Sequence, residues 1–517
     1  MLPFEYKKDY IAILDFGSQY TQLIARRIRE ANVYSEIFPY QIKVEELLKN
    51  PPKGIIFSGS PASLPGNQPL LCDKRLFELK IPILGICYGA QLIAEMLGGE
   101  VVSASRAEFG KVKVLIKEKK GIFYEFPEET ICWMSHQDCI KVIPSGFEII
   151  ASSANNMATA IGNSKKKIYG LQFHPEVTHT FLGKRVFENF IFRICNCQKS
   201  WKIDHYMQNM IKDIREKVRG DRVVAGVSGG IDSLVAARLT YQAIGQQLFC
   251  IFINNGLLRK DESQEVQNIF SHHFKLDLIY LDASKDFLEA LKGVSDPEKK
   301  RKIIGEKFIR LFEEKAKSLG GVKYLLQGTL YPDVIESVSL CGPSSTIKSH
   351  HNVGGLPQIM DLEVLEPLRY LFKDEVRKMA HKMKLPEEII WRQPFPGPGL
   401  AVRVVGTVEE EKLNILREAD AIIKEEMISA NLYRKVWQSF GVLLPIKSVG
   451  VMGDLRTYQY VLVLRVVVSE DGMTADWAKI PHKVLEKIST RVINEVKGIN
   501  RVVFDISSKP PATIEWE

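Results

Sequence analysis

One cysteine lies where a nucleophile would be exposed. The run Gly85-Ile86-Cys87-Tyr88-Gly89 follows an apolar, strand-like segment and opens a helix-like one. A tight strand-to-helix turn with glycines on both sides lifts a side chain clear of the sheet, and a helix amino terminus favours the thiolate. Backbone N–H groups in such a turn can receive an oxyanion. Cys87 is therefore a candidate nucleophile, although a buried structural cysteine is the commoner outcome for this motif alone.

A histidine and a carboxylate further along the chain could complete a triad with this cysteine. His174-Pro175-Glu176 comes directly after the apolar segment IYGLQF. A histidine at a strand end can act on a thiol, and a carboxylate two residues later can hold the imidazole in the useful tautomer. A lone histidine is more often structural. The joint occurrence of both motifs within one α/β pattern is more specific than either part.

A second motif is typical of an anion site. Ser228-Gly229-Gly230-Ile231-Asp232-Ser233 lies between the apolar run VVAGV and a helical segment that starts at Leu234. Successive glycines let backbone N–H groups converge on an anion, and the helix amino terminus adds a positive end. The alternative is a glycine-rich turn without a ligand. Asp232 could bind Mg²⁺ beside phosphates or simply cap the helix. No G-x-x-x-x-G-K-[ST] motif occurs, so kinase-like γ-phosphate chemistry is not expected.

Alternating strands and helices must position both motifs. Residues 9–198 and 205–394 each show β-branched runs that alternate with amphipathic helical segments, and a charged helical connector joins them. Residues 395–517 change character, with two long helical segments and apolar strands around Phe440 and Val461. The predicted fold class is α/β: two doubly wound, mostly parallel-sheet domains followed by a small α+β domain.

The composition is that of a folded protein of two to four domains. The amino-terminal residues lack the pattern of a signal peptide, and the longest apolar stretch, Tyr458–Val468, contains Arg465 and is too short to span a bilayer. Eight scattered cysteines without a CxxC pair favour reduced thiols. A net charge of +8 suits phosphate-bearing ligands but is too diffuse to indicate nucleic acid. We expect a cytoplasmic protein that binds neither nucleic acid nor membrane.

The first domain resembles the class I glutamine amidotransferases. That resemblance implies that Cys87 attacks the glutamine carboxamide, that His174 protonates the departing ammonia and that Glu176 completes the triad. The turn Ser58-Gly59-Ser60-Pro61 matches the family's oxyanion turn, with the N–H groups of Gly59 and Tyr88 as donors. Ser60 stands where many members have a second glycine.

The string S-G-G-x-D-S resembles the PP-loop of the ATP pyrophosphatases, which adenylate a substrate and release pyrophosphate. The resemblance implies ATP as co-substrate and Mg²⁺ on Asp232. The implied ATP-binding residues are Ser228, Gly229, Gly230, Ile231, Asp232, Ser233 and Leu234.

Four further segments resemble the GMP synthetase family: DVIES, IKSHHN, FPGPGL and KPPATIEWE, at residues 333–337, 347–352, 395–400 and 509–517. Composition alone would describe a surface loop and a frayed tail. The resemblance spans essentially the whole chain, and it implies XMP, ATP and glutamine as substrates and a homodimer formed by the third domain. The implied XMP-binding residues are Arg301, Gln438, Arg501, Lys509, Ile514 and Glu515; the implied lid residues are Asp333, Glu336, Lys348, His350 and His351.

Three other functions deserve comparison. A tRNA-modifying PP-loop enzyme commonly needs a reactive cysteine beside ATP and a basic face, whereas Cys250 and Cys341 are isolated here. An NAD synthetase would share the glutaminase and the PP-loop, but the tail KPPATIEWE speaks against it. A glutamine sensor or scaffold that had lost its chemistry is disfavoured by the intact triad and loop.

Overall fold

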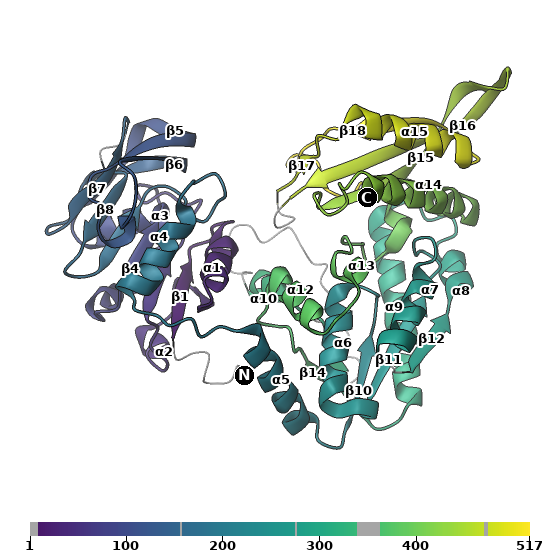
Figure 1. The fold of residues 1–517 in the computed structure, drawn as a ribbon, viewed down its shortest axis with the longest axis horizontal. Helices are drawn as coiled ribbons and strands as arrows, with labels where there is room; N and C mark the ends of the chain where they lie inside the picture. Colours follow the sequence, from purple (N-terminus) through teal and green to yellow (C-terminus); the bar gives the residue numbers. More distant parts are fainter. Residues whose placement is uncertain (1–8, 156–157, 275–276, 339–361, 470–473) are drawn as a thin grey trace. The chain divides into compact units, whose positions relative to one another are not determined.

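The computed structural model describes residues 9–155, 158–274, 277–338, 362–469 and 474–517, and the chain divides into two compact units (Figure 1). The first unit comprises Met1–Asn209 and Tyr331–Ser349, and the second comprises Met210–Leu330 and His350–Glu517. The short helix α10 (Tyr331–Val338) is thus grouped with the first unit, although it follows a strand of the second.

The first unit is built on a sheet of nine strands in the order β2-β1-β3-β4-β9-β8-β7-β5-β6. Neighbours from β2 to β9 are parallel, and the remaining neighbours are antiparallel. The central strands β1, β3, β4 and β9 are buried almost throughout, which explains their continuous apolar runs. The bounds are β1 (Tyr10–Asp15), β2 (Tyr34–Pro39), β3 (Gly54–Phe57), β4 (Ile83–Ile86), β5 (Glu100–Ile116), β6 (Glu129–Val142), β7 (Glu148–Ser153), β8 (Ala160–Asn163) and β9 (Ile168–Leu171).

Helices of this unit follow parallel strands, as the sequence predicts. The helix α1 buries one face, with Leu23, Ile24 and Ile28 turned inward, and keeps basic residues in its last turn, where they complement the helix dipole. The helices are α1 (Thr21–Glu30), α2 (Val44–Leu47), α3 (Tyr88–Met96) and α4 (Gly183–Glu188), and the connector is α5 (Ile203–Val218).

The second unit contains a five-stranded sheet in the order β12-β11-β10-β13-β14, with every neighbouring pair parallel. Its strands are β10 (Arg222–Gly226), β11 (Leu248–Asn254), β12 (Leu278–Asp282), β13 (Val322–Leu326) and β14 (Glu363–Leu365). Its helices are α6 (Ile231–Ile244), α7 (Glu262–Ile269), α8 (Ser284–Ala290), α9 (Pro297–Ser318), α12 (Lys373–Lys382) and α13 (Glu387–Ile390).

A smaller sheet completes the second unit, with β16 (Leu455–Val468) at its centre. β15 (Gln438–Met452) and β17 (Asp476–Trp477) pair with it antiparallel, and β18 (Ile499–Asp505) pairs with it parallel. The helices α14 (Glu410–Ser429) and α15 (His482–Glu495) accompany this sheet. One apolar cluster joins both sheets, because it contains Val224 and Leu325 as well as Leu416 and Leu464. The predicted α/β class with a small α+β part is confirmed. In the described part of the chain, no helix is long and apolar enough to cross a membrane.

Candidate active sites

Cys87 lies on a strained turn between β4 and α3. Its backbone has φ 53° and ψ −108°, a conformation that non-glycine residues rarely adopt. A Cβ at Gly85 would lie 2.4 Å from the Gly89 carbonyl, and a Cβ at Gly89 would lie 2.5 Å from the Phe57 carbonyl oxygen. Both glycines are therefore required by close packing. The Cys87 N–H donates to the Leu171 carbonyl at 2.7 Å, which ties the turn to the end of β9.

His174 and Glu176 form a buried pair after β9. His174 Nδ1 lies 2.7 Å from Glu176 Oε1, and both side chains are almost completely buried. The His174 backbone N–H donates to the Trp133 carbonyl at 3.0 Å, and the Tyr20 ring meets the imidazole edge-on. The Arg27 guanidinium donates to the Glu176 main-chain carbonyl at 2.9 Å. The imidazole is therefore oriented by the Glu176 hydrogen bond and the Tyr20 ring, while main-chain hydrogen bonds hold the two residues in place.

The pKa of His174 is raised to about 10. Burial by itself lowers this pKa, but the Glu176 carboxylate and the Cys87 side chain both favour the imidazolium and outweigh burial. An imidazolium that persists well above neutral pH is suited to stabilise a neighbouring thiolate and to donate a proton to a leaving group.

The predicted oxyanion turn lies beside these groups. A Cβ built on Gly59 would lie 3.3 Å from His174 Cε1 and 3.7 Å from Cys87 Cβ, and Tyr88 is the first residue of α3. Gln172 is a neighbour that the sequence did not single out: its Nε2 lies 3.8 Å from Cys87 Sγ. Its position just before His174 was the only available signal.

The PP-loop connects β10 to α6 in the second unit. Gly229 has φ +75°, which favours glycine, and the Ser233 hydroxyl donates to the Gly230 carbonyl at 2.9 Å. Ile231, Asp232, Ser233 and Leu234 form the first turn of α6. The Leu234 N–H donates to the Gly230 carbonyl at 3.1 Å, and the N–H groups before it precede the first intrahelical hydrogen bond. Strand, loop and helix amino terminus thus occur in the order that an anion site requires.

Asp232 projects from this turn and forms an ion pair with Lys373, the first residue of α12. Its other carboxylate oxygen, Oδ1, is buried and has no hydrogen-bond partner among the described residues. An orphaned carboxylate oxygen fits a hard cation, which typically takes one or two carboxylates and completes its shell with phosphate and water. Within the described ranges there is no cluster of three or more His, Cys, Asp or Glu side chains that would cage a metal by itself. Sequence reasoning missed Lys373, because an isolated lysine carries no signal.

The tail is held by buried cations. Arg403 has no exposed side-chain surface and pairs with both carboxylate oxygens of Glu515, at 3.0 and 2.8 Å. Gln438 Nε2 donates to Glu515 Oε1 at 2.9 Å, and Ile514 packs against the cluster around Phe440. The predicted residues Gln438, Ile514 and Glu515 are thus brought together. Arg403 Nη1 is a buried donor without a partner in the described structure.

Two other predicted residues also contact this tail or belong to it. Arg301 in α9 donates to the Glu517 main-chain oxygen, and the fully buried neighbour Lys300 pairs with the Glu517 side chain. Lys509 exchanges two backbone hydrogen bonds with Ala475. The tail is therefore docked along the C-terminal sheet, whereas composition alone would describe it as frayed.

Arg501 is not brought to the same place. It aligns with Val461 of β16, whereas Gln438 aligns with Val467, six residues further along that strand. At 3.2–3.4 Å per residue this separation is roughly 20 Å. The Arg501 side chain instead contacts Ser448 and Val449.

The predicted lid lies mostly beyond the described structure. Asp333 and Glu336 belong to α10, whereas Lys348, His350 and His351 lie outside the described residues.

Three family models match successive parts of the chain. The family model for glutamine amidotransferase class-I matches residues 12–194, that for NAD synthase matches residues 203–303, and that for the GMP synthase C terminal domain matches residues 425–516. The last match distinguishes the chain from an NAD synthetase, whose family model covers only the segment around the PP-loop.

Full-length relatives carry the same combination. The chain is 58% identical to a glutamine-hydrolysing GMP synthase of Brachyspira hyodysenteriae, over 98% of this chain and 99% of that protein. It is 54% identical to the one of Clostridium tetani over 99% and 100%, and 56% identical to the one of Caldanaerobacter subterraneus over 99% of each. The resemblance first drawn from the motifs is thereby confirmed: the chain belongs to the family of glutamine-hydrolysing GMP synthases.

Proposed function

We propose that this protein is a carbon–nitrogen ligase that converts XMP, ATP and glutamine into GMP, AMP, pyrophosphate and glutamate. The observation that carries the proposal is the presence, in one chain, of a buried Cys-His-Glu triad and a PP-loop whose unit also holds the docked tail KPPATIEWE. The first group releases ammonia, and the second activates its acceptor.

In the glutaminase, Cys87 attacks the carboxamide carbon, and the oxyanion is received by the N–H groups of Gly59 and Tyr88. His174 then gives its proton to the departing ammonia, and water hydrolyses the glutamyl thioester. Glu176 keeps the imidazole oriented and charged, a role that the 2.7 Å contact and the raised His174 pKa support.

In the synthetase, the loop of residues 228–234 binds ATP phosphates through backbone N–H groups and the amino terminus of α6. The O2 of XMP attacks the α-phosphorus, the bond to pyrophosphate breaks, and ammonia then displaces AMP at purine C2. Lys373 can neutralise charge on the departing pyrophosphate. Asp232 would hold Mg²⁺, which supplies charge neutralisation on the phosphates when bound.

For the acceptor, we propose a site around Gln438, Ile514, Glu515 and Lys509, with Arg301 as a further contact. The unpartnered Nη1 of Arg403 supports a polar ligand beside Glu515. A buried donor without a hydrogen bond is costly, and a polar atom of the ligand would remove that cost. Arg501, Asp333, Glu336, Lys348, His350 and His351 remain predictions from the family resemblance.

The proposed function is tested by following the loss of XMP absorbance as GMP forms, with ATP, Mg²⁺ and either glutamine or ammonium chloride. Turnover with both nitrogen donors is the expected result. Turnover with ammonia alone would place the failure in the glutaminase, and no turnover with either donor would refute XMP as the acceptor.

Replacing Glu176 by Gln should move the pH dependence of glutamine hydrolysis. Burial lowers the His174 pKa, but Glu176 and Cys87 together raise it to about 10, so the protonated imidazole is present below that pH and is lost above it. Without the carboxylate the pKa falls, so the basic limb of the kcat/KM profile should shift to lower pH. Glutamate release, measured from neutral pH to about pH 10 in both proteins, checks this. An unchanged basic limb would contradict the role given to Glu176.

Replacing Glu515 by Gln should weaken XMP selectively. The change removes the charge that Arg403 pairs with but keeps an oxygen for Gln438. Loss of one charge-assisted contact corresponds to a rise in the KM for XMP of about tenfold or more, whereas the KM for ATP should change little. Steady-state kinetics with ammonia measures both constants. Truncation after Lys509 should show the same asymmetry, and equal effects on both substrates would make the tail merely structural.

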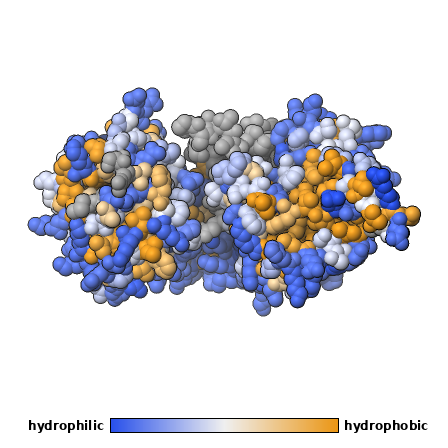
Figure 2. Space-filling view, turned by 90° about the horizontal axis from the view of Figure 1, so that it is seen from above, coloured by the Kyte–Doolittle hydropathy of each residue, from blue (hydrophilic) through white to orange (hydrophobic). Residues whose placement is uncertain are grey.

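We further propose that residues 9–198, 205–394 and 395–517 are the glutaminase, synthetase and dimerisation domains of a cytoplasmic homodimer. The exposed apolar residues of the β15–β16 hairpin support the dimer: Val451, Leu455 and Tyr458 are 74%, 73% and 65% exposed. Val449 and Tyr458 lie directly opposite each other on one face of this hairpin. Figure 2 shows apolar side chains gathered on the C-terminal part of the second unit, as a protein interface requires.

A further inference from the structure

Arg392, in the segment before FPGPGL, contacts the backbone of the PP-loop. Its Nη1 donates to the Gly229 carbonyl at 2.9 Å, and its Nη2 lies 3.1 Å from Glu262 and 3.0 Å from Glu265. The side chain is mostly buried, and a Cβ on Gly229 would lie 2.9 Å from Nη1. The guanidinium is therefore packed directly against the loop.

The contact between Arg392 and the Gly229 carbonyl determines the direction in which the Gly230 N–H points. The Gly229 carbonyl and the Gly230 N–H belong to one planar trans peptide group, so they point in opposite directions. Because Arg392 binds the carbonyl, the Gly230 N–H is turned to the opposite side, where it donates to the Ser228 hydroxyl at 3.4 Å. A phosphate oxygen can replace this long contact without any rotation of the peptide group.

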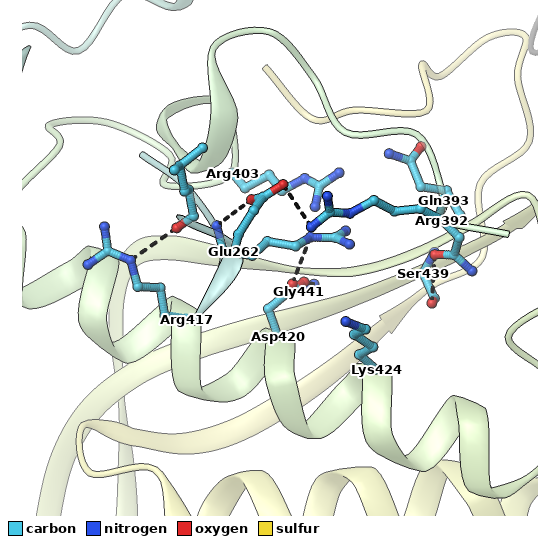
Figure 3. Close-up of polar contacts among 12 residues, drawn as sticks. Glu262, Arg392, Gln393, Arg403, Arg417, Asp420, Lys424, Ser439 and Gly441 are labelled. Carbon is cyan, nitrogen blue, oxygen red and sulfur yellow. Dashed lines mark hydrogen bonds and ion pairs between the residues drawn. The ribbon is translucent and has the colours of Figure 1, made fainter. Parts of the chain in front are cut away.

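Arg392 pairs with Glu262, which is linked through Arg259 to Asp420. Glu262 is buried and also accepts from the Arg259 backbone N–H at 2.9 Å. The Arg259 guanidinium lies 3.1 Å from Asp420 of α14, and the other Asp420 oxygen accepts from the Gly441 N–H of β15. Figure 3 shows Arg392 beside Glu262, with Asp420 and Gly441 nearby. The orientation of Arg392 is thus anchored in the C-terminal sheet.

The two residues after Arg392 connect to the tail. The Gln393 side chain accepts from the Ser439 N–H at 2.8 Å, and the Pro394 carbonyl accepts from Gln438 Nε2 at 2.9 Å. The same Gln438 nitrogen lies 2.9 Å from Glu515. Three consecutive residues therefore contact the PP-loop, β15 and a residue that holds the tail.

We propose that Arg392 is a positioning residue of the synthetase: it orients the Gly230 N–H toward the ATP phosphates and couples the loop, through residues 393–394, to the acceptor site at Gln438 and Glu515. The proposal rests on the proposed function, because it assumes that ATP occupies this loop. The coupling implies that the loop and the tail lose alignment together when the guanidinium is removed.

The test compares Arg392→Ala with Arg392→Lys and a matched control, Arg434→Ala, in ammonia-dependent GMP synthesis. Arg434 lies shortly before β15 and forms an exposed ion pair with Glu387. In Arg392→Ala the KM for ATP should rise about tenfold or more, since a charge-assisted hydrogen bond is lost. The lysine variant should be intermediate, because an ammonium lacks the fork that spans two acceptors. The control should match the wild type.

Chemical rescue separates positioning from folding. Guanidinium ion at non-denaturing concentration should restore ATP use in Arg392→Ala, whereas sodium chloride of equal ionic strength should not. It should not rescue Gly229→Ala, whose methyl group meets Val266 at 2.5 Å and whose φ of +75° is strained. A KM for ATP within about twofold of the wild type, or equal rescue by both salts, would overturn the proposal. If Arg392→Ala does not fold, the lysine variant decides by the same KM. An inactive wild type would refute the proposed function instead.

Discussion

Cys87→Ala should abolish GMP synthesis from glutamine and leave synthesis from ammonium salt close to the wild-type rate. The Cys87 thiol is the only group in the described glutaminase site that can form the glutamyl thioester. Losing the nucleophile of a triad costs at least about 10⁴-fold in rate. The PP-loop and the proposed acceptor residues at Gln438 and Glu515 lie in the other compact unit, so ammonia supplied from solution replaces only the lost product.

The measurement is the XMP absorbance assay with each nitrogen donor in parallel. Cys132→Ala is the matched control, because Cys132 is a buried thiol of the same sheet whose pKa burial raises to about 12. That variant should use both donors. Loss of synthesis with ammonia in Cys87→Ala, despite normal folding, would show that the two chemistries are not separable.

The parallel half of the fold could be predicted because burial on both faces leaves an unbroken apolar run. Such runs in β1, β3, β4 and β9, each followed by a polar or glycine turn, indicate strands without any tertiary information. β6 alternates buried and exposed residues and includes the polar stretch SHQD. The antiparallel half was therefore not recognised, because a half-buried strand with polar residues has a weak pattern.

Some candidate site residues could be predicted from the sequence, and others could not. Cys87, His174 and Asp232 occur in short motifs whose spacing is set by local backbone geometry, so the sequence exposes them. Lys373 and Arg403 act through contacts with residues far along the chain, Asp232 and Glu515. Nothing in a sequence distinguishes a fully buried arginine from a surface one, and only the fold reveals that Arg403 is buried.

Arg501 remains a prediction from the resemblance, but its position is known only from the fold. The strand register puts it near Ser448, away from Gln438. The register of β18 depends on its pairing with β16. The sequence of β18 alone therefore does not show which residues Arg501 lies beside.

Asp232→Asn should abolish GMP synthesis with glutamine and with ammonia alike. The amide keeps the shape of the side chain but removes the charge that pairs with Lys373 and the anionic oxygen that fits a cation. Because adenylation precedes amination, no nitrogen donor can bypass the defect, and a loss of about 10²-fold or more is expected for a group that neutralises phosphate charge. Raising the Mg²⁺ concentration should recover part of the activity.

Asp221→Asn is the control for this change, since Asp221 forms an exposed pair with Lys323 just before β10, at the far end of that strand from the PP-loop. It should retain wild-type synthesis and the same Mg²⁺ dependence. The two aspartates lie in one strand–loop–helix segment, but Asp232 pairs with Lys373 beside the PP-loop, whereas Asp221 pairs with Lys323 at the other end of β10. Synthesis at the wild-type rate in Asp232→Asn would mean that this carboxylate only secures Lys373 at the start of α12, and that the cation is held by the nucleotide without it.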